Sequence, residues 1–332
     1  MSKYLLPRVF QAMSVPAVVV LVVVGMFGVA SAQGFPTGPI TLICPWPAGG
    51  GSDIAMRLVA DAAGKKLGVP VVVVNKPGAG STIGMHEVAM SKPDGYTLGM
   101  PASAQIAAQY TNPNADEISA FTPIAFFGED PSLISARAET GYKTVADFVA
   151  AARANPGRIR NGNDQPPGSS YVAIAVFEKK LNVKVTRVPY AGFAPTVVAL
   201  LSGELDTATV PAPDVVEHHR AGKVRVLGVA ATARHFLLPD VPTFREQGFD
   251  IVVGSWRSIA GPVGIPEDRL RLLESKFVEA MNEPEFKERA KNAGFLVTPK
   301  GSAETLARWK ADDEMLYPIL LDAGLVKFRQ KR

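Results

Sequence analysis

Short runs of β-branched residues alternate with segments of helical periodicity along most of this chain. Residues 40–44 predict a buried strand, and apolar residues spaced through 53–67 predict a helix that follows it. A second strand over 71–74, a second helix over 82–90 and a third strand over 97–100 continue the order. Strands that alternate with helices favour a parallel sheet covered by helices on both faces. The sequence therefore predicts an α/β fold.

The alternation resumes beyond residue 133 and predicts a second sheet, so we expect two α/β lobes with a ligand cleft between them. The expected crossings between the lobes are short and lie near Gly128–Pro131 and Val253–Trp256, where two lobes can hinge about a ligand. These crossings assign 33–128 and 255–332 to lobe 1 and 129–254 to lobe 2. The further expected elements are helices over 144–154, 169–181, 194–202, 213–221, 266–282, 284–292 and 302–322, and strands over 158–161, 184–188, 206–210 and 224–230.

The N-terminus has the three parts of a secretory signal peptide. Lys3 and Arg8 precede an apolar run over 17–30, which ends in the small residues Ala30-Ser31-Ala32. The run is shorter than the ~20 residues that a membrane-spanning helix needs. We therefore expect residues 1–32 to be a signal peptide cleaved after Ala32, and the mature protein to lie in a bacterial periplasm. The alternative is an uncleaved N-terminal anchor.

Composition excludes several classes of function. With 35 basic and 31 acidic side chains and no Lys/Arg run, nucleic acid is not an expected partner. The single cysteine, Cys44, excludes an intrachain disulfide and a cysteine-cluster metal site. The four histidines show no metal-binding spacing, and no G-x-S-x-G motif is present. We therefore expect no catalytic residues, no metal and no cofactor.

The segment Pro45-Trp46-Pro47-Ala48-Gly49-Gly50-Gly51-Ser52-Asp53 joins the first expected strand to the first expected helix. Three glycines let the backbone approach a ligand closely, and the helix that follows offers unpaired N–H groups. Together they predict an anion site that needs no cationic side chain. The alternative is a structural turn in which Ser52 or Asp53 is an ordinary N-cap. The segment matches neither a phosphate loop nor the dinucleotide pattern.

Two further segments predict donors at the same edge of the first sheet. Residues 75–81 follow a strand and open a helix, with Ala79 and Gly80 at the turn, and Ser103 follows the third strand. Ligands of open α/β sheets bind beyond the carboxyl ends of the strands, where these segments lie. The alternative for 75–81 is a plain turn.

The second lobe offers its own candidates. Gly168, Ser169 and Ser170 open a helix and would supply hydroxyl and N–H groups to a second anionic group. Tyr190, followed by Gly192, would pack on an apolar part of the ligand or donate its hydroxyl; its alternative is a core tyrosine. Asp206 would accept from a ligand hydroxyl or a bridging water, or is a solvated turn residue.

An ordered series of motifs resembles the Bug-type extracytoplasmic receptors, the substrate-binding proteins of tripartite tricarboxylate transporters. The resemblance implies a two-lobed, type II-like periplasmic binding protein that takes organic carboxylates. It implies that Ala48 to Asp53, helped by Gly78–Ser81, hold one carboxylate, that the loop around Gly168–Ser170 holds the far end, and that Asp206 anchors bridging waters. The motifs cover 45–53, 71–84, 92–98, 188–192, 200–206, 221–230, 238–243 and 255–266.

The loop before Gly168 departs from the pattern of that family. Pro166 and Pro167 remove two N–H donors, Asp164 adds a negative charge, and Tyr171 stands where the family usually has a histidine. A second ligand carboxylate would be repelled by Asp164 unless that side chain turns away. We therefore predict a ligand with one carboxylate and a neutral, hydroxylated or aromatic far end, lined by Trp46 and Tyr190.

The sequence thus predicts a periplasmic receptor that closes on an organic acid and delivers it to membrane transporter subunits, acting as a monomer. One alternative is a receptor that presents its ligand to a sensor protein, and another is an exported enzyme acting on a carboxylate. The candidate ligand-binding residues are Trp46, Ala48, Gly49, Gly50, Gly51, Ser52, Asp53, Ala79, Gly80, Ser103, Gly168, Ser169, Ser170, Tyr190, Gly192 and Asp206.

Overall fold

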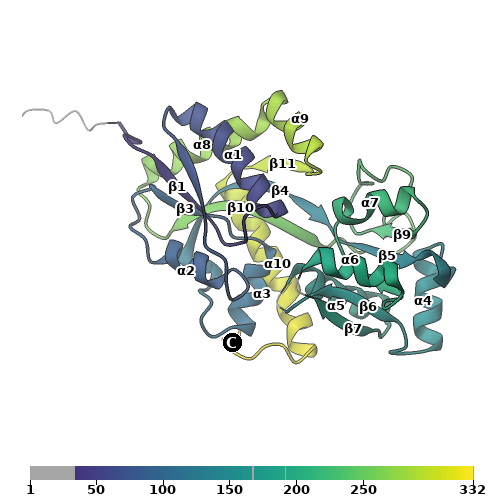
Figure 1. Cartoon of the computed structure of the whole chain (residues 1–332). Helices are drawn as coiled ribbons and strands as arrows, with labels where there is room; N and C mark the ends of the chain where they lie inside the picture. Colours follow the sequence, from purple (N-terminus) through teal and green to yellow (C-terminus); the bar gives the residue numbers. More distant parts are fainter. Residues whose placement is uncertain (1–33, 167, 191, 332) are drawn as a thin grey trace, which may run out of the picture. The chain divides into compact units, whose positions relative to one another are not determined.

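Two β-sheets organise the chain. The computed structural model describes residues 34–166, 168–190 and 192–331. Contacts divide the chain into an N-terminal unit that ends at Phe35 and a second unit, Pro36–Arg332, which holds both sheets (Figure 1). The expected signal peptide, 1–32, lies outside the described residues.

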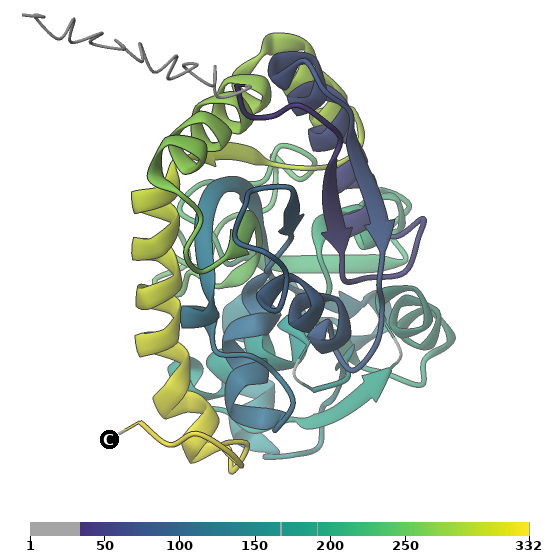
Figure 2. The same ribbon diagram turned by 90° about the vertical axis from the view of Figure 1, so that its left-hand side faces the viewer.

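The first sheet has six strands in the order β11-β4-β10-β3-β1-β2. β1 runs parallel to both β2 and β3, and Figure 2 shows β1 and β2 as neighbouring arrows, whereas β10 is antiparallel to β3 and β4. Its strands are β1 (Ile40–Cys44), β2 (Val71–Asn75), β3 (Thr97–Gly99), β4 (Phe121–Pro131), β10 (Gly254–Pro262) and β11 (Val297–Lys300). The helices joined to it are α1 (Gly51–Leu67), α2 (Thr82–Ala89), α3 (Ser103–Thr111), α8 (Glu267–Asn282) and α9 (Pro284–Asn292).

The second sheet has five strands in the order β7-β6-β8-β5-β9, and β6 is parallel to both β7 and β8. Its strands are β5 (Leu133–Arg137), β6 (Arg160–Asp164), β7 (Thr186–Tyr190), β8 (Thr207–Ala208) and β9 (Val224–Val229). Its helices are α4 (Val145–Ala154), α5 (Ser169–Leu181), α6 (Phe193–Ser202) and α7 (Ala212–Arg220). The short 3₁₀ turns are η1 (Ile118–Ala120) and η2 (Ala138–Thr140).

The chain passes between the sheets at two places. β4 ends at Pro131 and β5 begins at Leu133, and β10 returns to the first sheet at Gly254. The last helix, α10 (Ser302–Asp322), packs on β4 and α3 and also contacts α5 of the second sheet; Figure 2 shows it as one long yellow helix. These connections hold the carboxyl edges of both sets of parallel strands next to one cavity, which is described below.

The strand after α4 is displaced from its predicted position. The sequence predicts a strand over 158–161, but β6 runs from Arg160 to Asp164 through Asn161, Gly162 and Asn163. Asparagine and glycine are turn residues, so their composition argued for a loop. Asn161 and Asn163 are fully buried, and Asn161 Nδ2 donates to Thr207 Oγ1 at 3.0 Å. Side-chain hydrogen bonds thus stabilise a buried strand that apolar periodicity does not reveal.

Candidate functional site

The loop after β1 presents free backbone donors at the start of α1. Gly50 is the N-cap of this helix, and Gly50 and Gly51 are exposed. The N–H groups of Gly50, Gly51 and Ser52 make no hydrogen bond within the described residues. Unpaired N–H groups at a helix N-terminus, together with the helix dipole, attract an anion. The donors that the predicted anion site requires are thus present, and the site itself stays a prediction.

Asp53 has a different position from the one that its place in the loop suggests. It lies inside the first turn of α1 and is 4% exposed. Its carboxylate accepts from the Gly49 N–H at 2.9 Å, from Asn75 Nδ2 at 2.9 Å and from Arg57 Nε at 3.0 Å. The bond from Arg57 lowers the pKa of Asp53 to about 2. These bonds connect Asp53 to the loop residue Gly49, to β2 and to the next turn of α1. The Asp53 oxygens are therefore already hydrogen-bonded in the free protein, and Asp53 stabilises the loop rather than contacting a ligand.

Trp46 is also tied to the base of this loop. Its carbonyl accepts from Asn75 Nδ2 at 3.0 Å. Its indole N–H is buried and has no hydrogen-bond partner within the described residues. Ala48 and Gly49 are exposed beside it. A buried donor without a partner costs free energy, and such a group is a candidate for pairing with a bound molecule.

Sequence reasoning missed Arg257, which lies behind the same loop. Its Nε donates to Ser52 Oγ at 3.3 Å, and its Nη1 pairs with Asp130 Oδ2 at 2.5 Å. The guanidinium carbon is 5.3 Å from the centre of the Phe295 ring. The Arg257 and Asp130 side chains are only 11% and 7% exposed, so the charge of each is offset by the other. Nothing in the sequence of β10 marks this arginine, because the pairing crosses between strands.

The loop after β2 carries unusual backbone geometry. Four successive residues have positive φ: Gly78 at 137°, Ala79 at 47°, Gly80 at 64° and Ser81 at 83°. Alanine and serine adopt this region at an energetic cost, and such strained segments cluster at functional sites. Because β2 lies beside β1 in parallel, this loop leaves the same edge of the sheet as the loop before α1.

Ser103 and Ser169 line one cavity although they belong to helices on different sheets. Ser103 begins α3, which follows β3, and Ser169 begins α5, which follows β6. Ser103 is 8% exposed, and its Oγ has no hydrogen-bond partner within the described residues. The other residues that line the cavity are Val172, Val253, Gly254, Arg308, Asp312, Met315 and Leu316. The lining residues that belong to α10 were not predicted. In the sequence, Arg308 and Asp312 have the four-residue spacing of an ordinary ion pair on a helix surface, which does not indicate a cavity.

The N-terminus of α5 is already occupied by a carboxylate of this chain. Asp164, the last residue of β6, accepts from Ser170 Oγ at 2.7 Å and from the Tyr171 N–H at 2.9 Å. Its own N–H donates to Ser170 Oγ at 2.8 Å. Burial raises the pKa of Asp164, and these hydrogen bonds oppose the shift. Asp164 does not turn away from the loop, as a second ligand carboxylate would require.

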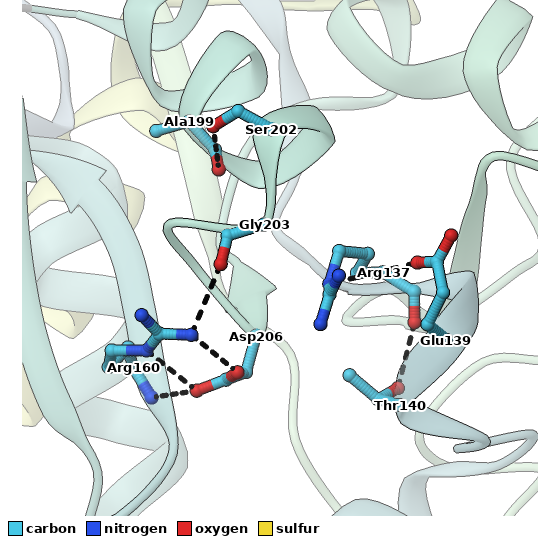
Figure 3. A network of polar contacts seen from close by, with 8 residues as sticks. All are labelled: Arg137, Glu139, Thr140, Arg160, Ala199, Ser202, Gly203 and Asp206. Carbon is cyan, nitrogen blue, oxygen red and sulfur yellow. Dashed lines mark hydrogen bonds and ion pairs between the residues drawn. The ribbon is translucent and has the colours of Figure 1, made fainter.

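Asp206 and Tyr190 form polar contacts of their own outside the cavity lining. Asp206 precedes β8 at the amino ends of the strands, and Figure 3 shows its carboxylate facing Arg160. Arg160 donates to it through Nη2 at 2.9 Å and through Nε at 3.1 Å. The Tyr190 hydroxyl donates to Glu204 Oε1 at 2.6 Å. The structure therefore does not bring either polar group to the cavity.

Gly192 stays near the second sheet's carboxyl edge. It is the N-cap of α6, and its carbonyl accepts from Thr196 Oγ1 at 2.8 Å. It follows β7, whose last residue pairs in register with Asp164.

Within the described residues, no group of three His, Cys, Asp or Glu side chains is arranged to hold a metal ion. No helix of the described part combines the length and apolarity needed to span a membrane.

Comparisons with known proteins identify relatives of this chain. Residues 55–318 match the family described as the tripartite tricarboxylate transporter family receptor, TctC. BugT of Bordetella pertussis is 30% identical over 273 residues, which cover 79% of this chain and 84% of that protein.

Two solved structures share the fold over most of their length. A TctC solute-binding protein from Polaromonas, solved without ligand, is 31% identical with a TM-score of 0.77, covering 87% of this chain and 99% of that one. MatC of Rhodopseudomonas palustris, solved with bound malate, is 28% identical with a TM-score of 0.73, covering 86% of this chain and 100% of that one.

Proposed function

The chain belongs to the family of receptors for tripartite tricarboxylate transporters, and we propose that it binds an organic carboxylate in the periplasm and delivers it to the membrane subunits of such a transporter. One observation carries the proposal: helix N-termini from both sheets meet at one cavity, marked by Ser103 and Ser169. The malate held by MatC supports a carboxylate as the ligand. The proposed role is binding without turnover.

The proposed carboxylate subsite is the start of α1. The N–H groups of Gly50, Gly51 and Ser52 would bind the carboxylate oxygens, and the strained loop over 78–81 would close the subsite from β2. Asp53 acts indirectly by holding Gly49 in place. Ser103 and Ser169 would contact the rest of the ligand. We leave Asp206 and the Tyr190 hydroxyl out of the proposed contacts, since Arg160 and Glu204 already pair with them.

We also propose the lobe boundaries that the sequence predicts, with 33–128 and 255–332 in lobe 1 and 129–254 in lobe 2. The chain crosses between the sheets at Ser132 and again just before Gly254, which supports these limits to within a few residues. Opening and closing would then bend the chain at these crossings. Small-angle scattering with and without a bound acid tests this, because closure reduces the radius of gyration.

Export to the periplasm through a cleaved signal peptide is part of the proposal. The charged start, apolar run and small residues at 30–32 support it. The intact mass of protein recovered from a periplasmic extract checks the cleavage, and a mass that still includes residues 1–32 would contradict it. We expect a monomer, which analytical ultracentrifugation tests.

The decisive experiment combines a ligand screen with a backbone substitution. A thermal-shift screen of mono-, di- and tricarboxylates should raise the melting temperature, since a ligand at 100 times its Kd adds about 2.7 kcal/mol of stability. Gly51→Pro then removes one proposed donor at the first position of α1, where helices accept proline. Gly51→Ala is the control because it keeps the N–H.

We expect Gly51→Pro to weaken binding of the acid found in the screen about tenfold while Gly51→Ala binds normally. The melting temperatures of the free variants should be close to that of the parent. Binding of every acid class unchanged by Gly51→Pro would contradict the proposed subsite. No response to any carboxylate, with mass spectrometry showing no ligand retained from the cells, would contradict the receptor function itself.

A further inference from the structure

The cavity is lined by the first residues of α3 and α5, and the start of α1 lies at the same edge of the first sheet as α3 because β1 and β3 are parallel. Of the starts of α1 and α5, only that of α1 offers free donors to an anion. At α1 the backbone donors are unpaired, as described above. At α5 the equivalent donors point to Asp164, because Ser170 Oγ and the Tyr171 N–H both bind its Oδ1. Ser170 and Tyr171 directly follow the wall residue Ser169. The negative charge that this helix N-terminus attracts is therefore supplied by the protein.

The glycine at the start of α5 fits this internal carboxylate. A Cβ placed on Gly168 would lie 2.2 Å from Asp164 Oδ2, which is far closer than atoms can approach. Gly168 has φ −54°, a value open to any residue, so backbone freedom is not what requires glycine here. The missing side chain makes room for the Asp164 carboxylate against the helix N-terminus.

Arg308, the cationic residue in the cavity wall, is already paired with carboxylates of this chain. Arg308 of α10 donates through Nε to Asp312 Oδ1 at 3.0 Å and through Nη1 to Glu129 Oε2 at 2.5 Å. Trp256 Nε1 donates to the other oxygen of Asp312. Two carboxylates thus offset one guanidinium, so this wall supplies no net positive charge to a ligand.

Ser103 Oγ in the cavity wall and Asn163 Oδ1, on the residue before Asp164, are buried oxygens without a hydrogen-bond partner within the described residues. Ser103 Oγ is buried in the wall without a partner, which is an energetic cost in the free protein that a ligand group can remove. A hydroxyl donates or accepts equally well, so it suits a neutral polar group. A carboxylate in the same place would lie beside Asp312 in the cavity wall and near the start of α5, to which Asp164 is bound. Like charges in a partly desolvated site repel strongly.

From these contacts we propose that the receptor selects acids with a single carboxylate, bound at α1, and that Asp164 rejects a second carboxylate at the far end. Asp164 is thereby a specificity-determining residue. The preferred far end is uncharged and forms hydrogen bonds with the serine hydroxyls. This inference rests on the proposed function, since it concerns the ligand of the same cavity.

Isothermal titration with matched acids tests the proposal. The panel pairs 4-hydroxybutanoate with succinate, 5-hydroxypentanoate with glutarate and 6-hydroxyhexanoate with adipate, so each pair differs only in the charge of one end. The parent protein should bind the hydroxy acid of the best pair at least tenfold more tightly than the diacid. Asp164→Asn keeps the shape of the side chain, and Asp164→Ser vacates the helix N-terminus.

Both Asp164 variants should bind the diacid at least tenfold more tightly than the parent does, with the hydroxy acid changed less than threefold. The control Asp147→Asn removes a carboxylate that accepts from backbone N–H groups at the N-terminus of α4 in the same lobe, and it should leave the ratio unchanged. A parent that prefers the diacid, or Asp164 variants with an unchanged ratio, would overturn this inference and leave the receptor function standing. Failure of all six acids together with the wider screen would instead overturn the proposed function.

Discussion

Arg257 Nε donates to Ser52 Oγ across 3.3 Å and so joins β10 to the loop that begins α1. The same guanidinium pairs with Asp130, at the end of β4 where the chain leaves the first sheet. The proposed carboxylate subsite is therefore fixed to the two strands nearest the crossings. If these strands move when the lobes open or close, the Arg257 side chain would transmit the movement to Ser52 in the subsite.

Replacing Arg257 by methionine should destabilise the protein by about 3–5 kcal/mol, because Asp130 would be left buried without its partner. The double variant Arg257→Met with Asp130→Leu should recover most of that loss. Urea unfolding of the two single variants and the double variant measures the coupling. A double variant no more stable than Arg257→Met alone would mean that the ion pair does not explain the cost.

Asp53→Asn should lower the free energy of unfolding at pH 7 by about 2 kcal/mol. Hydrogen bonding to Arg57 lowers the pKa of Asp53 from 3.8 to about 2, and each pKa unit corresponds to about 1.4 kcal/mol. This stability is present above pH 3.8 and is lost as the pH falls through 2. The variant should lose that part of the pH dependence. Asp61→Asn is the control on the same helix, because its side chain is 42% exposed and surface pairs contribute about 0–1 kcal/mol.

Asp214 should make the protein less stable at neutral pH. Burial, with a contribution from Asp130, raises the pKa of Asp214 to about 6. The folded state therefore holds this proton more tightly than the unfolded chain, so the contribution to stability is present below pH 3.8 and is lost as the pH rises through 6. Asp214→Asn should be up to about 3 kcal/mol more stable than the parent at pH 7.5, with the difference vanishing near pH 3.5. Thermal unfolding across this range would show parallel curves if the assignment were wrong.

The alternation of strands and helices over β1 to β3 and over β6 to β9 could be predicted from the sequence because apolar periodicity carries it. Helix α3 and the strands β4, β10 and β11 were not predicted, and their antiparallel pairing makes the first sheet mixed rather than parallel. β1, α5 and α9 match their predicted bounds, and the family identified from the motifs is confirmed by the match over 55–318. The polar strand β6 was predicted too early, since its stability depends on partners such as Thr207 that are distant in sequence.

The same limit explains the candidate site. Gly-rich loops could be placed at strand ends from the local pattern alone. The partners of Asp206 and Tyr190 could not, because Arg160 and Glu204 reach them only through the folded sheet. Arg257 and Arg308 were missed for the same reason: their role depends on carboxylates contributed by other elements. Local sequence thus located the loops, and only the tertiary pairing tells which side chains remain available for a ligand.

Gly168→Ala should allow diacids to bind more tightly although Asp164 itself is not substituted. The added methyl group would lie 2.2 Å from the Asp164 carboxylate, so that carboxylate must leave the N-terminus of α5. We expect diacid affinity to rise about threefold or more, and stability to fall by about 1–3 kcal/mol because a buried hydrogen-bonded group is displaced. Combining Gly168→Ala with Asp164→Ser should restore stability, as the clash is then absent. If the combination is as unstable as Gly168→Ala alone, the clash lies elsewhere.

Replacing Ser103 should maintain or raise the stability of the free protein and lower its affinity for the ligand. Its Oγ is buried without a partner, so Ser103→Ala removes an unpaired polar group and should raise stability by about 1 kcal/mol or leave it unchanged. Affinity for the bound acid should fall about tenfold, since the hydroxyl pairs with the ligand. Ser135→Ala is a matched control, because Ser135 Oγ is equally buried and unpaired but does not line the cavity. It should change stability in the same direction and leave affinity unaltered. Equal losses of affinity in both variants would point to a general effect on the fold, and unchanged affinity in Ser103→Ala would remove this serine from the proposed contacts.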